Sequence, residues 1–172
     1  MQKRVFLDAD GALLAEGLKA APYLIKPNDD ELSRLAGKKL ETIEELTAEG
    51  QKLLESGIER VVISLGGRGA LYLRKGSDDA ALERSMREIT LAGANTLENT
   101  LEGLKVPVGS TVGAGDSVVA ALAYAESQDM SEEDAVRLST ATGAANVMCS
   151  GTQAAERSVI EELLPKVRFS KL

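Results

Sequence analysis

The sequence predicts a layered α/β fold with a mainly parallel sheet. First, short strand-like runs alternate with helix-like segments in residues 4–73, an order typical of parallel strands joined by crossover helices. Second, a length of 172 residues, 44% apolar and 27% charged, fits one compact core. Third, no internal repeat or low-complexity linker divides the chain, so residues 1–172 are expected to form a single domain.

The first part of the chain supplies the expected sheet. Apolar runs bounded by turn residues predict strands at 4–8, 23–25, 60–65 and 70–73. Apolar residues at helical spacing predict helices at 12–20, about 29–36 and about 42–57. Asn28 and Thr42 precede the second and third of these helices as capping residues, and Gly37 and Gly57 can end them.

The second part is more helical. Helices are expected at 115–127, at 131–148 behind the capping pattern Ser131-x-x-Asp134, and at about 156–164. Residues 74–105 are predicted to be a surface insertion. Within it, Leu82, Met86 and Ile89 have helical spacing, and 96–104 is a second candidate helix.

Composition excludes several classes of function. The chain has no histidine, so it cannot build a Ser-His-Asp or Cys-His pair or a His-bearing zinc site alone, and acid-base chemistry falls to carboxylates or lysines. A net charge of −7 and 3% aromatic residues argue against nucleic acid as a partner. No G-x-x-x-x-G-K-[ST] motif occurs, which argues against a P-loop hydrolase.

Composition also bears on location. The apolar runs are far shorter than the ~20 residues needed to cross a bilayer, and no signal-type stretch follows Met1. Cys149 is the single cysteine and cannot form an internal disulfide. A cytoplasmic protein without membrane contact is therefore expected, and Cys149 is interpreted as a small buried residue.

The segment Ser110–Ser117, STVGAGDS, is the strongest chemical motif. Two glycines at the start of a helix let main-chain amides face an anion, where the helix dipole adds positive potential. Asp116 lies at the edge of this cradle, in reach of a substrate hydroxyl that needs a general base. The alternative is a capping aspartate beside glycines that permit close packing.

The run 110–123, STVGAGDSVVAALA, resembles the second signature of the ribokinase-like, or PfkB, carbohydrate kinase family. KPNDDEL at 26–32, SLGGRGA at 64–70 and Gly151 in SGTQ support the resemblance in the expected order. The form of the motif is most similar to the hexose-phosphate branch, which contains 1-phosphofructokinases and tagatose-6-phosphate kinases. The resemblance implies a ribokinase-like α/β/α fold that here lacks the N-terminal half and its lid.

The resemblance also implies roles for individual residues. Asp116 matches the catalytic base, and the amides of Gly113, Ala114 and Gly115 match the anion hole. Positions matching nucleotide contacts are Lys26, Asn28, Ser64, Leu65, Gly66, Gly67, Arg68, Gly69, Gly115 and Asp116, and 143–146 match the adenine side.

The implied cofactors are ATP and Mg²⁺. Asn28 and Glu31 match the family's N-x-x-E motif for magnesium, although the same spacing equally fits a helix capping box. Ser110, Val112 and Gly151 match positions that bind a monovalent cation through main-chain oxygens.

The expected function is phosphoryl transfer from ATP to a hexose phosphate. The alternative is a truncated, inactive fragment that binds nucleotide or a partner, because family members carry a first half with the sugar-binding residues and the lid. Since that half is missing here, self-association or a separately encoded N-terminal half is the expected partner.

Overall fold

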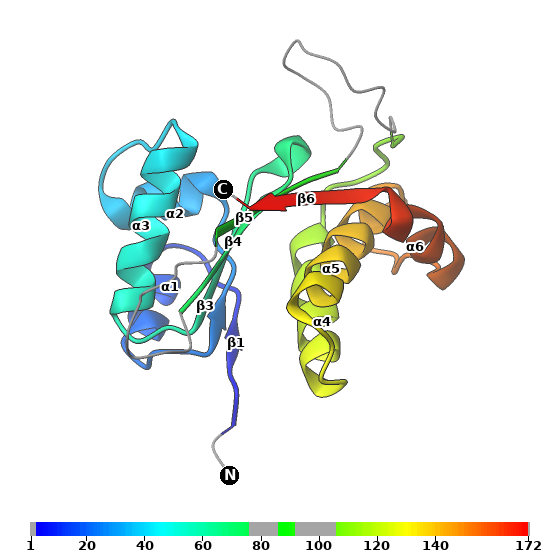
Figure 1. Cartoon of the computed structure of the whole chain (residues 1–172). Coiled ribbons are helices and arrows are strands. Elements are labelled where there is room, and N and C mark those ends of the chain that lie inside the picture. The colour runs from blue at the N-terminus through cyan, green and yellow to red at the C-terminus, as the bar shows by residue number, and fades with distance from the viewer. Residues whose placement is uncertain (1–2, 76–85, 92–105, 172) are drawn as a thin grey trace. The chain divides into compact units, whose positions relative to one another are not determined.

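The computed structural model describes residues 3–75, 86–91 and 106–171. The chain divides into two compact units, and Gly67–Gly69 group with the C-terminal one. Figure 1 labels the helices and strands of both units.

The first unit contains the predicted strands. They are β1 (Phe6–Leu7), β2 (Leu24–Ile25), β3 (Arg60–Ser64) and β4 (Ala70–Arg74). β1 pairs with β2 and β2 with β3 in parallel, and the register places Phe6, Leu24 and Arg60 side by side. β4 returns antiparallel to β3 through the single turn η1 (Gly66–Arg68). The predicted strands and the mainly parallel order are confirmed, with one antiparallel hairpin added.

Three predicted helices complete the first unit, α1 (Gly11–Leu18), α2 (Asp29–Ala36) and α3 (Ile43–Glu55). Alternate residues of the strands, such as Val61 and Ile63, face these helices and are fully buried. Leu32 of α2 and Leu46 of α3 pack into the same apolar cluster. The strand residues that alternate with those facing the helices belong to the opposite face of the sheet. They are also buried, since Leu24, Val62 and Tyr72 are 1%, 2% and 6% exposed.

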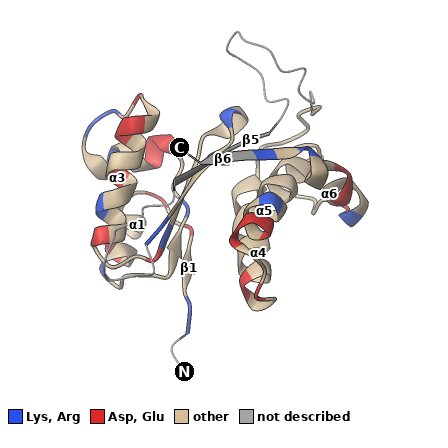
Figure 2. Ribbon diagram, viewed as in Figure 1, with Lys and Arg blue, Asp and Glu red and all other residues tan. Residues whose placement is uncertain are grey.

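The start of α3 shows how local sequence fixes a helix end. Thr42 Oγ1 accepts from Glu45 N at 3.2 Å, and Glu45 Oε2 accepts from Glu41 N at 2.8 Å and Thr42 N at 3.2 Å. These bonds from the Glu41 and Thr42 amides hold the pKa of Glu45 below its ordinary value. Figure 2 shows acidic residues in red at this end of α3, where the helix dipole favours negative charge.

The second unit is helical, as expected. It holds α4 (Ala114–Ser127), α5 (Glu132–Val147) and α6 (Arg157–Leu163). The turn η2 (Leu164–Lys166) and the strand β6 (Val167–Lys171) follow α6, and neither was predicted. α4 and α5 approach closely because Gly143 lies against Val118, where a Cβ would come within 2.7 Å of Val118 Cγ2.

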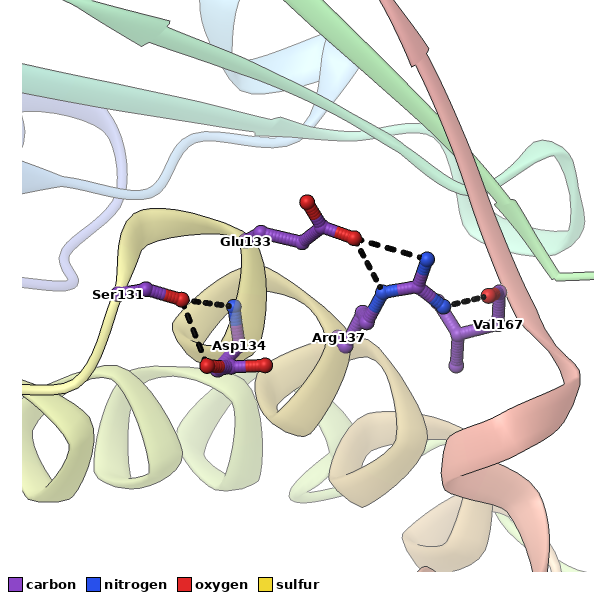
Figure 3. Close-up of polar contacts among 5 residues, drawn as sticks. All are labelled: Ser131, Glu133, Asp134, Arg137 and Val167. Atoms are coloured by element: carbon purple, nitrogen blue, oxygen red, sulfur yellow. Dashed lines mark hydrogen bonds and ion pairs between the residues drawn. The ribbon is translucent and has the colours of Figure 1, made fainter.

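Arg137 connects α5 to the start of β6 (Figure 3). Its Nη1 donates to the main-chain oxygen of Val167 at 2.7 Å. Its Nε and Nη2 donate to Glu133 Oε1 at 3.1 Å and 3.0 Å. One turn earlier, Ser131 Oγ accepts from Asp134 N at 3.1 Å and caps α5, as its sequence pattern predicts.

The expectation for residues 74–105 is corrected in one place. Residues Met86–Leu91 form a strand, β5, so the helical spacing of Met86 and Ile89 is misleading. Ile89-Thr90-Leu91 alternates apolar and polar residues, and β-branched Ile89 and Thr90 favour a strand. Leu82 and the candidate helix at 96–104 lie outside the described residues. Within the described ranges, no helix combines the length and apolar character needed to span a bilayer.

Candidate functional site

Two of the predicted site segments meet at the carboxyl ends of β2 and β3. Asn28 and Ser64 form a parallel bridge, and Ser64 N donates to Pro27 O at 3.0 Å. The structure therefore brings the segment that begins with Lys26-Pro27-Asn28 next to the segment that begins at Ser64, at the carboxyl end of the parallel strands. In parallel α/β sheets this edge is where ligands bind.

Lys26 lies next to this bridge and is buried, with 6% of its side chain exposed. Its Nζ is 3.4 Å from Oδ2 of Asp8, whose side chain is 27% exposed. Asp8 is not among the predicted site residues, although its position directly after a predicted buried strand is a signal for a residue at this end of the sheet. The Asp8 carboxylate compensates the Lys26 charge. This pairing lowers the free-energy cost of burying a cation at the site.

Asn28 and Glu31 adopt the capping geometry that their spacing left open. Asn28 Oδ1 accepts from Glu31 N at 2.7 Å, and Glu31 Oε2 accepts from Asn28 N at 2.8 Å. Each side chain thus uses one oxygen to start α2. Among the described residues, no group of three or more Asp, Glu, Cys or His has a metal-binding arrangement. A magnesium role for Asn28 and Glu31 stays a prediction.

The glycine-rich turn after β3 exposes its main chain. Leu65 is 5% exposed and anchors the turn in the core. Gly66 and Gly69 have φ of +59° and +99°, which favour glycine. A Cβ at Gly66 would meet no atom within 4 Å, so the main chain there is open to a ligand. Gly67 and Arg68 are also exposed, as a turn that approaches phosphate requires.

The start of α4 has the form of an anion cradle. Gly113 is the N-cap with φ of +84°, and no side chain caps the helix. Ala114 N reaches Thr111 O at 3.4 Å, whereas the amides of Gly115 and Asp116 have no acceptor among the residues that the structure describes. Free amides at a helix start attract an anion.

Asp116 lies in the first turn of α4 and is exposed. Its carboxylate has no hydrogen-bond or ion-pair partner in the described part of the chain. The capping alternative for this aspartate is therefore not the observed geometry. A free carboxylate beside unpaired amides is the arrangement that a general base next to an anion hole needs.

The segment before α4 packs against the end of α5. Gly109 N and Ser110 N both donate to Val147 O, at 2.8 Å and 3.1 Å. A Cβ at Gly109 would lie 2.9 Å from Met148 O, so only glycine fits there without a shift. Ser110, one of the three expected cation positions, is thus held at the end of α5, while Val112 and Gly151 are exposed.

Asn146 lies beside the cradle and is 3% exposed. Its Nδ2 donates to Gln153 O at 3.0 Å, and its Oδ1 is buried without a hydrogen-bond partner in the part of the chain that the structure describes. A Cβ at Gly113 would lie 3.6 Å from this oxygen. Gly143, at the other end of the expected adenine side, packs against Val118 of α4, and a role of 143–146 on the adenine side stays a prediction.

Comparison with known proteins gives one family. Residues 1–158 match the model of the pfkB family of carbohydrate kinases. The 1-phosphofructokinase of Haemophilus influenzae is 34% identical over 169 residues, which are 98% of this chain and 48% of that enzyme. The chain thus spans about half the length of this relative.

Solved structures agree on the fold. Phosphofructokinase-2 from Escherichia coli in complex with substrates and products superposes with a TM-score of 0.77 at 28% identity, over 94% of this chain and 47% of that one. A ribokinase from Arabidopsis thaliana complexed with ribose and ATP gives 0.73 at 26% identity, with the same coverage of 94% and 47%. The predicted ribokinase-like α/β fold is confirmed.

Proposed function

Because the chain belongs to the pfkB family of carbohydrate kinases, we propose that it is the nucleotide-binding part of a sugar-phosphate kinase. In this proposal the γ-phosphoryl group of ATP is transferred to a hydroxyl of a hexose phosphate. One observation carries the proposal: the free amides of Gly115 and Asp116 lie at the start of α4 beside the unpaired carboxylate of Asp116. Base and anion hole then belong to one turn of one helix.

Asp116 acts as the general base. Its carboxylate accepts the proton of the acceptor hydroxyl as that oxygen bonds to phosphorus, and the leaving group is ADP. Because no group among the described residues holds this carboxylate, it can turn toward the hydroxyl.

The segment Gly113–Gly115 is proposed as the anion hole, together with the Asp116 amide; of its amides, that of Ala114 already reaches Thr111 O at 3.4 Å. Negative charge spreads over the equatorial oxygens of the transferring phosphoryl group, and amides fixed by a helix start stabilise that charge without reorganising. The positive end of the α4 dipole adds to the same effect.

Lys26 and the turn Ser64–Gly69 are proposed to hold ATP. The open main chain at Gly66 supports this role, because only glycine lets phosphate oxygens come so close. Magnesium bound with ATP supplies charge neutralisation on the phosphates. Asn28 and Glu31 would orient water on that ion through the oxygen atoms that the capping box leaves over.

A monovalent cation is proposed at Ser110, Val112 and Gly151. Phosphofructokinase-2 from Escherichia coli has been solved in complex with potassium. In this chain the main chain at Ser110 is fixed against α5, which supports an ordered set of carbonyl oxygens. The hexose-phosphate class of acceptor rests on the matched 1-phosphofructokinases.

The second candidate is an inactive fragment that binds nucleotide or a partner chain. The coverage of about half of each relative favours it, since the other half of those kinases has no counterpart in these residues. Nucleotide binding and turnover therefore have to be measured separately.

The test begins with thermal unfolding with and without Mg-ATP. A ligand at ~100 times its dissociation constant adds about 2.7 kcal/mol to a folded site. Asp116→Asn should keep this stabilisation and lose about 100-fold or more in turnover with a hexose phosphate. Gly115→Val should lose the stabilisation itself.

Asp129→Asn is the matched control. Asp129 is an exposed aspartate just beyond the other end of α4, with φ of +50°, which asparagine tolerates. If Asp116→Asn turns over as fast as the wild type, Asp116 is not the general base. An ATP-induced shift without turnover in the wild-type chain would favour the inactive fragment.

A further inference from the structure

The side-chain amide of Asn146 is bonded at one end only. Asn146 lies in the last turn of α5 and is 3% exposed. Its Nδ2 donates to Gln153 O at 3.0 Å, and this bond assigns the two ends of the amide. Oδ1, at the other end, is buried and accepts no hydrogen bond from the residues that the structure describes. Because an unbonded buried acceptor is costly, we expect a donor from outside these residues to meet it.

Oδ1 is directed at the start of α4, within the same unit. A Cβ at Gly113, the N-cap of α4, would lie 3.6 Å from Oδ1. Apart from the chain neighbours of Gly113, no other atom in the described part of the chain would lie within 4 Å of that Cβ. Gly113 N also has no acceptor among the described residues. A free donor and a free acceptor therefore lie near each other, with room for a small molecule.

The position of Oδ1 conflicts with a bare anion hole. The oxygen end of an amide dipole is negative, so Oδ1 would repel a phosphoryl oxygen in the cradle. A water molecule between them removes this conflict, because it can donate one O–H to Oδ1 and the other to the anion. The water oxygen can accept from Gly113 N. Such a water makes three hydrogen bonds, about the number that ordered waters in protein interiors make.

We propose that Asn146 holds an ordered water on the Gly113 amide, and that this water is a further donor of the anion hole. Asn146 is then a positioning residue, because it acts on the anion only through the water. A side chain at position 113 would occupy the place of the water, which adds a reason for glycine there beyond its φ of +84°. The inference rests on the proposed anion hole and adds one group to it.

The first test is a high-resolution crystal structure of the 172-residue chain, grown with rubidium chloride. A peak within hydrogen-bond distance of both Asn146 Oδ1 and Gly113 N is expected, without anomalous signal from rubidium. Rubidium at this place would make Oδ1 a cation ligand and would overturn the proposal. A structure in which no peak joins these two atoms would overturn it as well.

The second test measures the anion hole with inorganic phosphate, followed by the NMR signals of the Gly113 and Gly115 amides. Phosphate carries no adenine, so an adenine contact of residues 143–146 cannot contribute. Asn146→Leu keeps the shape of the side chain without its polar atoms and should weaken phosphate binding about fivefold or more. Asn146→Asp keeps the acceptor but places a negative charge beside the anion, and it should weaken binding further.

Stability separates this role from a structural one. The unfolding midpoint of Asn146→Leu should change little, because an apolar side chain of the same shape leaves no buried polar atom unbonded and Gln153 is exposed to water. Arg137→Met, earlier on the same helix, is the matched control. It loses the bond to Val167 O, so it should lower the unfolding midpoint and leave phosphate binding unchanged.

Phosphate binding by Asn146→Leu that equals the wild type would overturn the proposal. So would a wild-type chain whose Gly113 and Gly115 amides bind no phosphate. If phosphate binding falls in step with the unfolding midpoint in both Asn146→Leu and Arg137→Met, Asn146 has a structural role alone. The expected effects in a chain that shows no turnover would support the water site and count only against the proposed activity.

Discussion

Lys26 and Asp8 form an ion pair across β1 and β2, with Nζ 3.4 Å from Oδ2 and only 6% of the lysine side chain exposed. The carboxylate of Asp8, which directly follows β1, thus offsets the cost of burying the lysine. Since Lys26 is also a proposed nucleotide contact, Asp8 is expected to hold it in position.

Asp8→Asn should destabilise the fold by about 2 kcal/mol, because it leaves the Lys26 charge uncompensated. Breaking a fully buried ion pair costs about 3–5 kcal/mol. The loss expected here is smaller because 27% of the Asp8 side chain is exposed. Urea unfolding measures the change. Adding Lys26→Met to Asp8→Asn should recover most of the loss and should also abolish stabilisation by Mg-ATP. Additive losses in the double variant would contradict a coupled pair.

Glu31→Gln separates capping from a role with magnesium. Glutamine serves at this position of a capping box, so the unfolding midpoint without nucleotide should change little. The variant removes the carboxylate charge, and the magnesium concentration that gives half of the ATP-induced shift should rise several-fold. An unchanged magnesium dependence would assign Glu31 to the capping box alone. Glu45→Gln is the matched control, because Glu45 caps α3 with the same geometry.

Gly143→Ala should destabilise the second unit although alanine is the better helix former. The new Cβ would lie 2.7 Å from Cγ2 of Val118, whose branched side chain has little freedom to move in a helix. Overpacking of this kind costs about 1–3 kcal/mol. Val118→Ala combined with Gly143→Ala should be more stable than Gly143→Ala alone. If Gly143→Ala raises the unfolding midpoint, the close approach of α4 and α5 is wrong.

Local signals explain what the sequence predicted well. The helices α2, α3 and α5 begin at Asn28, Thr42 and Ser131, and in each the capping side chain accepts the expected amide. Such bonds span three residues, so they can be predicted without knowledge of the fold. The GAGD motif is equally local, because its amides and carboxylate lie in a single turn.

Long-range relationships were missed or misjudged. Asp8 meets Lys26 only because β1 and β2 are adjacent, and Asn28 meets Ser64 only because β2 and β3 are. Spacing alone favoured a helix over 82–89, although Met86–Leu91 form a strand. β6 was missed because Val167–Lys171 is short and half polar, and Arg137 ties its first residue to α5 from far away in sequence.

Arg137→Met should cost about 1–3 kcal/mol, because it leaves the main-chain oxygen of Val167 without its donor and Val167 is 1% exposed. The methionine keeps much of the apolar stem, so the loss reports mainly on the hydrogen bond. Glu133→Gln removes only the partly exposed ion pair to the same arginine and should cost at most about 0.5 kcal/mol. Urea unfolding of both variants compares the two contacts directly. A larger loss in Glu133→Gln than in Arg137→Met would mean that the arginine serves α5 alone, and β6 would need another anchor.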